Sequence, residues 1–320
     1  MQIENPYHEG ELLAQRRVGV VDEAVRNGRA ISDSIVRGAL SFVSQQPMAI
    51  LASVDGGLDV WVSALFGQPG FISAVDERTV ELNSTRSFSD PEDPLWVNIE
   101  SRQKVGLLVI ELATRRRLRI NGRITQVRPQ RYRLDVEESY PNCPKYIQRR
   151  EIKPAVGEPS EPSDPGEPRR GRELRDEHRD LIRGADTFFV ASTHPTRGAD
   201  ASHRGGHPGF VRFLDDRTIR VPDYVGNNMF NTLGNLAANP RAGLLFLDFD
   251  RRRSLQLVGR AEIQWQLDDP RHETGGTRRY WDFEIERWRE ASLHHPFAWE
   301  LLDRSPHNPV PTAPPDSDRA

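Results

Sequence analysis

The stretch DASHRGGHPGF, residues 200–210, places a hydroxyl, an imidazole and a guanidinium beside two glycines. Arginine suits phosphate binding, because its planar fork donates two hydrogen bonds to a dianion. A neighbouring glycine lets the backbone approach a ligand closely. Ser202, His203, Arg204 and Gly205 are therefore candidate phosphate-binding residues. The alternative interpretation is a polar surface hairpin, which the same turn residues also favour.

A second polar cluster precedes and begins an expected helix that ends at Asn239-Pro240. Its members are Asn227, Asn228, Asn231 and Thr232. Free N–H groups and the dipole make a helix N-terminus a favourable place for phosphate. Asparagine is also a common helix N-cap. Both roles stay open, since they can hold for different asparagines.

The chain repeats itself at a long interval. The motif GQPGF at 67–71 recurs 139 residues later as GHPGF, and further on VGLL at 105–108 matches AGLL at an offset of 137. This period is too long for a solenoid unit, so it indicates a duplicated domain. In the first copy, Ser202-His203-Arg204-Gly205 becomes Ser63-Ala64-Leu65-Phe66, and the following turn is rich in acid. The first copy is therefore predicted not to bind phosphate in the same way. It is expected to be a structural partner that completes the interface, or a remodelled substrate lid.

Each copy reads as five or six short apolar strands with one or two helices, which predicts a small antiparallel barrel. The expected fold is mainly β with flanking helices (α+β), built as two tandem split β-barrels. The expected parts are a helical segment at 1–44, a first barrel at 45–135, a connecting segment with a Pro-rich linker at 136–182, a second barrel at 183–268 and a C-terminal extension at 269–320.

Composition excludes several classes of function. The net charge of −3 argues against a general nucleic-acid or anionic-membrane surface. A single cysteine, Cys143, can form no intrachain disulfide and fits a cytoplasmic protein. The first residues lack the features of a signal peptide, and no apolar run approaches the roughly 18 residues of a membrane helix. The histidine pairs at 203/207 and 294/295 lack a metal-binding context, so no metal is expected.

Residues 215–263 run from DDRT through a helix that ends in NPR to the strands with GLLF and GRAE. This stretch resembles the FMN-binding split barrels of the pyridoxamine 5′-phosphate oxidase superfamily. NCPKYIQRR, residues 142–150, is similar to a recurring signature of uncharacterised members. The resemblance implies FMN at an interface between two barrels, with its phosphate on basic and hydroxyl side chains from one strand and from the turn entering the helix. The Asn-rich turn is less basic here than in the superfamily.

The resemblance adds weaker candidates. It places Gln256 near the flavin, although a solvent-facing polar residue is the alternative. Tyr146, Arg149 and Arg150 could reach the flavin or an anionic substrate. Backbone groups near Asp223 could face the ring, although a turn-forming role is the favoured interpretation of Asp223. Cys143 is expected to be a small buried residue. The arginine runs at 115–117 and 251–253 are expected at solvated hairpin tips.

The predicted function is that of an FMN-dependent oxidoreductase with a small-molecule substrate or an electron donor such as NAD(P)H. The two barrels are expected to pair within one chain as a pseudo-dimer, or across a homodimer. The alternatives are a non-catalytic flavin, haem or deazaflavin carrier or sensor, and a purely structural barrel. No residue is identified as a catalytic acid or base, and the C-terminal region offers no clear second phosphate site for vitamin B6 oxidation.

Overall fold

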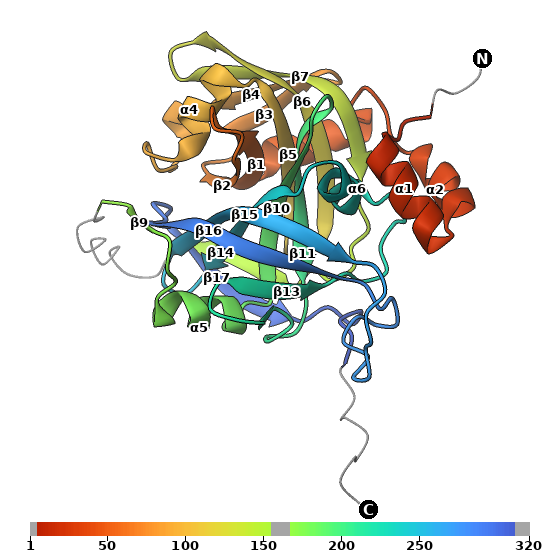
Figure 1. Ribbon diagram of the computed structural model, residues 1–320. Helices are drawn as coiled ribbons and strands as arrows, with labels where there is room; N and C mark the ends of the chain where they lie inside the picture. The colour runs from red at the N-terminus through yellow and green to blue at the C-terminus, as the bar shows by residue number, and fades with distance from the viewer. Residues whose placement is uncertain (1–4, 155–166, 311–320) are drawn as a thin grey trace, which may run out of the picture.

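The computed structural model describes residues 5–154 and 167–310, and it confirms a mainly β, antiparallel fold of two barrels (Figure 1). The first half of the chain forms the upper barrel in this view and the second half the lower one. The Pro-rich stretch 155–166 and the last ten residues lie outside the described residues. No helix in the described ranges is long and apolar enough to cross a membrane.

The first sheet has the strand order β2-β1-β5-β6-β7-β4-β3. Apolar residues dominate its central strands, which is why β1 and β5 are buried almost throughout. Its strands are β1 (Met48–Val54), β2 (Val60–Phe66), β3 (Ile72–Asp76), β4 (Thr79–Asn83), β5 (Lys104–Glu111), β6 (Arg116–Arg128) and β7 (Arg131–Pro141).

The second sheet repeats this topology strand for strand, in the order β11-β10-β14-β15-β16-β13-β12. The sequence repeat is therefore visible as two sheets of the same connectivity. Its strands are β10 (Thr187–His194), β11 (Gly198–Gly205), β12 (Arg212–Phe213), β13 (Thr218–Pro222), β14 (Arg241–Asp248), β15 (Arg253–Gln264) and β16 (Tyr280–Ser292), with the short β9 (Arg169–Gly171) beside β16.

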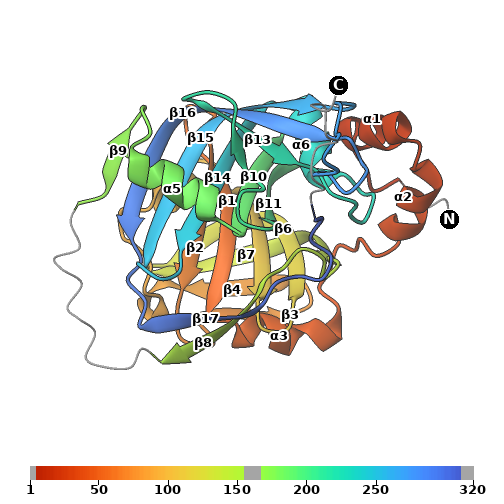
Figure 2. The same cartoon turned by 90° about the horizontal axis from the view of Figure 1, so that it is seen from below.

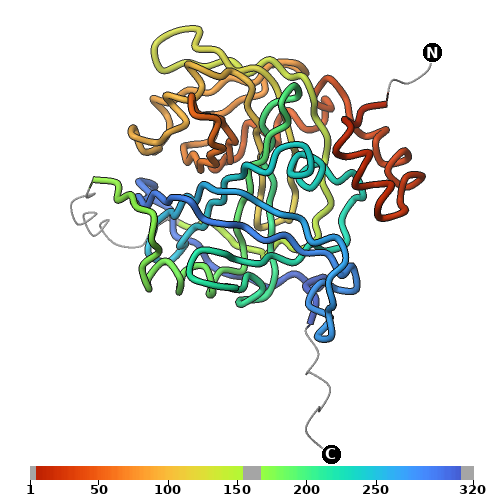
Figure 3. Tube along the Cα trace, viewed as in Figure 1, coloured from red at the N-terminus to blue at the C-terminus, as the bar shows by residue number. Residues whose placement is uncertain are grey.

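The helices lie around the barrels. Equivalent helices α4 and α6 are tied to equivalent strands, since Asn98 Nδ2 donates to Ser53 Oγ and Asn235 Nδ2 to Ser192 Oγ, both at 3.0 Å. Figure 3 shows the N-terminal trace beside the chain at α6. The helices are α1 (Glu9–Val18), α2 (Val21–Gly28), α3 (Leu40–Gln45), α4 (Pro94–Ser101), α5 (Asp176–Gly184) and α6 (Asn231–Ala238), with 3-10 turns at Arg37–Ala39 and Ser84–Arg86.

Each barrel has its own apolar core, and a third apolar cluster joins the two halves. In this shared cluster Ile50 and Leu108 of the first half pack with Phe189 and Leu245 of the second, all fully buried. The backbones also approach closely, because a Cβ on Gly106 would lie 2.5 Å from the Cα of Asp200. The barrels therefore meet through a continuous interior.

Strands extend beyond the barrel limits expected from the repeat. β7 continues to Pro141, past 135, and β16 at Tyr280–Ser292 lies wholly after 268. The physical reason is that β6 and β15 are long and must be hydrogen-bonded along their length, which β7 and β16 provide. Beyond the barrels, β8 (Arg149–Pro154) pairs with β17 (Phe297–Asp303), so the two connecting regions meet (Figure 2).

Candidate functional site

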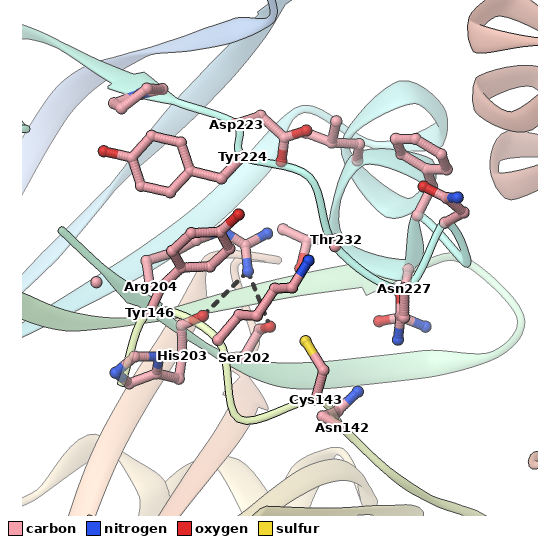
Figure 4. Close-up of a pocket in the computed structure, with 18 of the residues that line it drawn as sticks. Asn142, Cys143, Tyr146, Ser202, His203, Arg204, Asp223, Tyr224, Asn227 and Thr232 are labelled. Carbon is pink, nitrogen blue, oxygen red and sulfur yellow. Dashed lines mark hydrogen bonds between the residues drawn. The ribbon is translucent and has the colours of Figure 1, made fainter. Parts of the chain in front are cut away.

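A polar cavity opens where β11 of the second barrel faces β6 of the first (Figure 4). The empty space in and around it is roughly 870 Å³ when the open solvent at its mouth is included. Its walls come from β6 (Arg117, Arg119), the connecting segment (Asn142, Cys143, Lys145, Tyr146), β11 (202–205), the segment after β13 (Asp223, Tyr224, Asn227, Asn228), the start of α6 (230–233) and Arg279.

Alternation along β11 decides which side chains face the cavity. Ser202 and Arg204 point the same way, and the Arg204 Nη1 donates to Ser202 Oγ and to the His203 carbonyl, both at 3.1 Å (Figure 4). The His203 ring points to the other side and packs against Phe189, with ring centroids 5.8 Å apart. His203 therefore lines the cavity with its backbone. Both of its ring nitrogens lack a hydrogen-bond partner among the described residues.

Arg204 is a cation that the described protein leaves unpaired. Its Nε has no hydrogen-bond partner, and its Nη1 reaches only a hydroxyl and a carbonyl. Burial lowers the pKa of the Arg204 guanidinium. A charge held away from water without a counter-ion is costly, and a bound anion would remove that cost.

Two further arginines enter the cavity from the first half, and they correct the expectation of solvated hairpin tips. Arg117 and Arg119 lie two apart on β6, so they share a face that is turned to the other barrel. Arg117 Nε donates to the Cys143 carbonyl at 2.9 Å, and burial lowers its pKa to about 10. In the described ranges Arg117, like Arg204, forms no ion pair. Of the run 115–117, only Arg116 is exposed.

Arg119 is already neutralised. It is 4% exposed, and its Nε lies 3.0 Å from Asp200 Oδ1 across the barrel junction. Its other nitrogens donate to Ser202 Oγ at 2.7 Å and to Tyr140 OH at 2.6 Å. Burial opposes the charge of Arg119, but Asp200 and Tyr140 outweigh burial and raise its pKa. Arg119 thus fixes the position of the Ser202 hydroxyl.

The connecting segment closes one side of the cavity. Tyr146 has φ of 67°, an unusual value for a side chain of this size, and its OH donates to the Val225 carbonyl at 2.9 Å. Its ring lies 4.8 Å from the ring of Tyr224. A Cβ at position 205 would lie 2.0 Å from the Tyr146 carbonyl, so this crossing requires Gly205. Cys143 lines the same wall and is half-buried.

The four predicted polar residues of the second barrel's turn all line the cavity. None of the asparagines caps α6, because its N-cap is Phe230 and has no side-chain hydrogen bond. Asn227 instead accepts from the Met229 N–H at 3.1 Å. Asn231 Nδ2 donates to Glu11 Oε1 at 3.2 Å, and Asn231 Oδ1 has no partner among the described residues. The first turn of α6 therefore faces the cavity without a protein cap.

Asp223 has a partner that the sequence did not suggest. Arg279 Nε donates to Asp223 Oδ2 at 3.0 Å, and both residues line the cavity. The residues that sequence reasoning missed are thus Arg117, Arg119, Lys145 and Arg279. The two on β6 carried a signal, since arginines two apart on a strand share one face.

Gln256 does not join the other candidates. It lies on β15, only 2% exposed, and donates to the Val62 carbonyl at 2.9 Å in a smaller cavity at the other junction of the barrels. The solvent-facing alternative is therefore also wrong. Arg149 and Arg150 pair with Asp303 and Asp186 and do not line the main cavity.

Two clusters away from the cavity bring together three possible metal ligands each: His8, Glu9 and His194, and Glu177, His178 and Glu290. In the first, His194 Nε2 lies 2.8 Å from Glu9, and His8 Nε2 lies 3.0 Å from Asn235. The Nδ1 atoms of both histidines accept backbone N–H groups. These contacts account for both rings, so we assign no metal there.

Comparison with known proteins gives one family match. Residues 174–290 match the family described as pyridoxamine 5′-phosphate oxidase. No curated protein matches the chain.

Solved structures resemble parts of the chain. HupZ of Group A Streptococcus is 19% identical over 41% of this chain and 98% of its own, with a TM-score of 0.30. A putative pyridoxamine 5′-phosphate oxidase of Lactobacillus delbrueckii is 13% identical over 36% and 93%, also at 0.30. An FMN-binding protein of Syntrophomonas wolfei is 12% identical over 36% and 84%, at 0.27.

Proposed function

Since the second barrel of this chain is a pyridoxamine 5′-phosphate oxidase-like split barrel, we propose that the chain binds FMN in the cavity between β11 and β6. Arg204, Arg117 and the Ser202 hydroxyl would hold the phosphate. The first turn of α6 would add its free N–H groups.

One observation carries the proposal: Arg117 and Arg204 are two half-buried arginines that form no ion pair within the described residues, and the Nε of Arg204 is buried without a hydrogen-bond partner there. A phosphate dianion would neutralise both and accept their charge-assisted hydrogen bonds. Arg119 cannot take that role, because Asp200 already neutralises it. It would instead present Ser202 in a fixed orientation.

The remaining walls suit a planar polar ligand. Tyr146 and Tyr224 form an aromatic surface next to the arginines, and Asn142, Asn227 and Asn228 offer amide groups. When bound, FMN supplies the ability to accept and pass on a hydride or single electrons. The protein's own contribution is to bind and orient the flavin and to keep water from its buried side.

We further propose an oxidoreductase with a small-molecule substrate or NAD(P)H as electron donor, working in the cytoplasm. The two barrels of one chain would take the place of the paired barrels of a homodimer. The chain offers no side chain that we assign as an acid or base.

The first test is FMN titration of the purified protein, followed by flavin absorbance and fluorescence. We expect saturation near one FMN per chain. Arg204→Met and Arg117→Met should each weaken binding by about 10- to 100-fold, since a hydrogen bond to a charged group contributes about 1.5–3 kcal/mol.

The matched control is Arg123→Met, which removes an exposed arginine from the same strand β6 and should leave FMN affinity unchanged. A protein that takes up no FMN, or an Arg204 variant with wild-type affinity, would reject the phosphate assignment. A Soret band on adding haem would instead favour a haem carrier. Anaerobic reduction of the bound flavin by NADH or NADPH then separates an enzyme from a carrier.

A further inference from the structure

A second, smaller cavity lies at the other junction of the barrels, where β2 of the first barrel faces β15 of the second. The empty space in and around it is roughly 340 Å³ when the open solvent at its mouth is included. In the duplicated fold, β2 of the first half corresponds to β11 of the second, and β15 of the second half corresponds to β6 of the first. The two cavities are therefore equivalent places in the duplicated fold.

The equivalence holds at individual residues. Ser63 stands where Ser202 stands in the other copy, and Gln256 stands where Arg119 stands. The contact between them is kept, because Gln256 Nε2 lies 3.3 Å from Ser63 Oγ as Arg119 Nη2 lies 2.7 Å from Ser202 Oγ. The strand partner of Arg119 is Tyr140, whereas the strand partner of Gln256 is Arg289. The smaller cavity therefore has a cation, Arg289 of β16, at the position that Tyr140 holds on β7 of the other half.

Arg289 is 1% exposed and lines this cavity. Its Nη1 donates to Gln256 Oε1 at 3.2 Å, and its Nη2 pairs with the Asp90 carboxylate. Its Nε is buried without a partner in the described part of the chain, as is the Ser89 hydroxyl nearby. The guanidinium of this cavity-lining residue therefore still has an unused hydrogen-bond donor.

The anions here belong to the protein itself. Asp93 Oδ1 accepts from Ser63 Oγ at 2.5 Å and from the Leu95 N–H at 2.9 Å, so Asp93 also caps α4. Asp90 comes from the turn before α4 and neutralises Arg289. In the main cavity the corresponding turn carries asparagines, and Arg117 and Arg204 have no such carboxylate within residues 5–154 and 167–310.

We propose that the smaller cavity is a second oxyanion site that the chain closes with its own carboxylate, Asp90. The Asp90 carboxylate pairs with Arg289 in the place where the acid group of a ligand would otherwise bind. Removing the Asp90 carboxylate therefore opens the site to a small oxyanion of the phosphate class. This inference rests on the smaller cavity alone and does not depend on FMN binding in the main one.

The test uses full-length protein and inorganic phosphate, with the melting temperature as the measured quantity. Asp90→Ala should melt lower than wild type, because Arg289 loses its counter-ion. Phosphate at about ten times its Kd should then raise the melting temperature of the variant by about 2 °C more than that of wild type. Asp90→Ser is the second variant, because its hydroxyl can replace the bond that Asp90 accepts from the Glu92 N–H.

The double variant Asp90→Ala/Arg289→Met is the matched control and should lose the additional phosphate effect. An equal effect of phosphate on wild type and both Asp90 variants would overturn the proposal, and so would an additional effect that survives the loss of Arg289. Failure of FMN binding in the main cavity changes neither comparison, since wild type is the reference in both.

Discussion

Arg204 and Arg117 differ from the other arginines of the cavity in one respect: neither has a carboxylate partner among the described residues. Arg119 and Arg279 are paired with Asp200 and Asp223. The cavity therefore contains two kinds of arginine, those paired with a carboxylate and those that we propose to bind the phosphate. The Arg204→Met and Arg117→Met variants test that separation.

Glu11, on α1, gives a prediction about pH. It is 4% exposed, and burial raises its pKa to about 8 from an ordinary 4.5. Between these values the folded protein holds a proton that the unfolded chain releases, so stability falls as pH rises. His8 has the opposite effect, because burial lowers its pKa to about 4 from 6.5, but it acts only below pH 6.5.

We therefore expect wild type to lose about 2 kcal/mol of unfolding free energy between pH 6.5 and 8 relative to Glu11→Gln. Urea unfolding at several pH values measures this difference. Glu23→Gln, at an exposed position of α2, is the control and should follow wild type. A Glu11 variant whose stability runs parallel to wild type would show that Glu11 is ionised in the folded state.

Some of these residues could be predicted from sequence and others could not. Ser202 and Arg204 stood out, because the repeat supplies a copy of the same strand without the charge. Arg117 did not stand out, because its face of β6 packs against the other barrel. The alternation of residues along β6 does not show which part of the molecule that face contacts. Gln256 was wrongly grouped with the main cavity for the same reason: its strand belongs to the equivalent junction.

At the scale of elements, two glycines control how closely the barrels approach. A Cβ on Gly106 of β5 would meet the backbone of β11 at 2.5 Å, and a Cβ on Gly243 of β14 would meet the Val60 carbonyl at 2.4 Å. These positions correspond in the repeat, so the two crossings are equivalent. The antiparallel strands and the helix before the long apolar strand of each copy followed from the sequence pattern, but this close approach did not.

Gly106→Ala and Gly243→Ala should each destabilise the protein by about 1–3 kcal/mol, because backbone atoms cannot yield as a flexible side chain does. Gly184→Ala is the control, since its Cβ would meet nothing within 4 Å. Denaturant midpoints compare the three variants. Equal midpoints for all three would contradict the close approach of β5 to β11 and of β14 to β2.

At the scale of the whole molecule, the shared apolar cluster makes the two halves interdependent. Phe189 and Leu245 of the second half are fully buried in the cluster that they share with Ile50 and Leu108 of the first. The pairing of β8 with β17 adds a second connection between the halves. Covalent continuity is thus not what holds the barrels together.

Two separately encoded pieces, residues 1–160 and 161–320, should therefore assemble into a stable 1:1 complex when produced together. Each piece alone should self-associate and bind a hydrophobic dye, because its side of the shared cluster is exposed. Size-exclusion chromatography with light scattering measures both outcomes. Two pieces that are monomeric and compact on their own would contradict a shared interior.

The joining of both barrels in one chain has a consequence for how such a protein can evolve. In a symmetric homodimer every substitution appears in both sites, so neither site can change without the other. Here Leu65 and Arg204 occupy corresponding positions yet are encoded separately. The junction of β2 with β15 can thereby change into a closed structural contact, while the junction of β11 with β6 can keep the residues that we propose to bind a ligand.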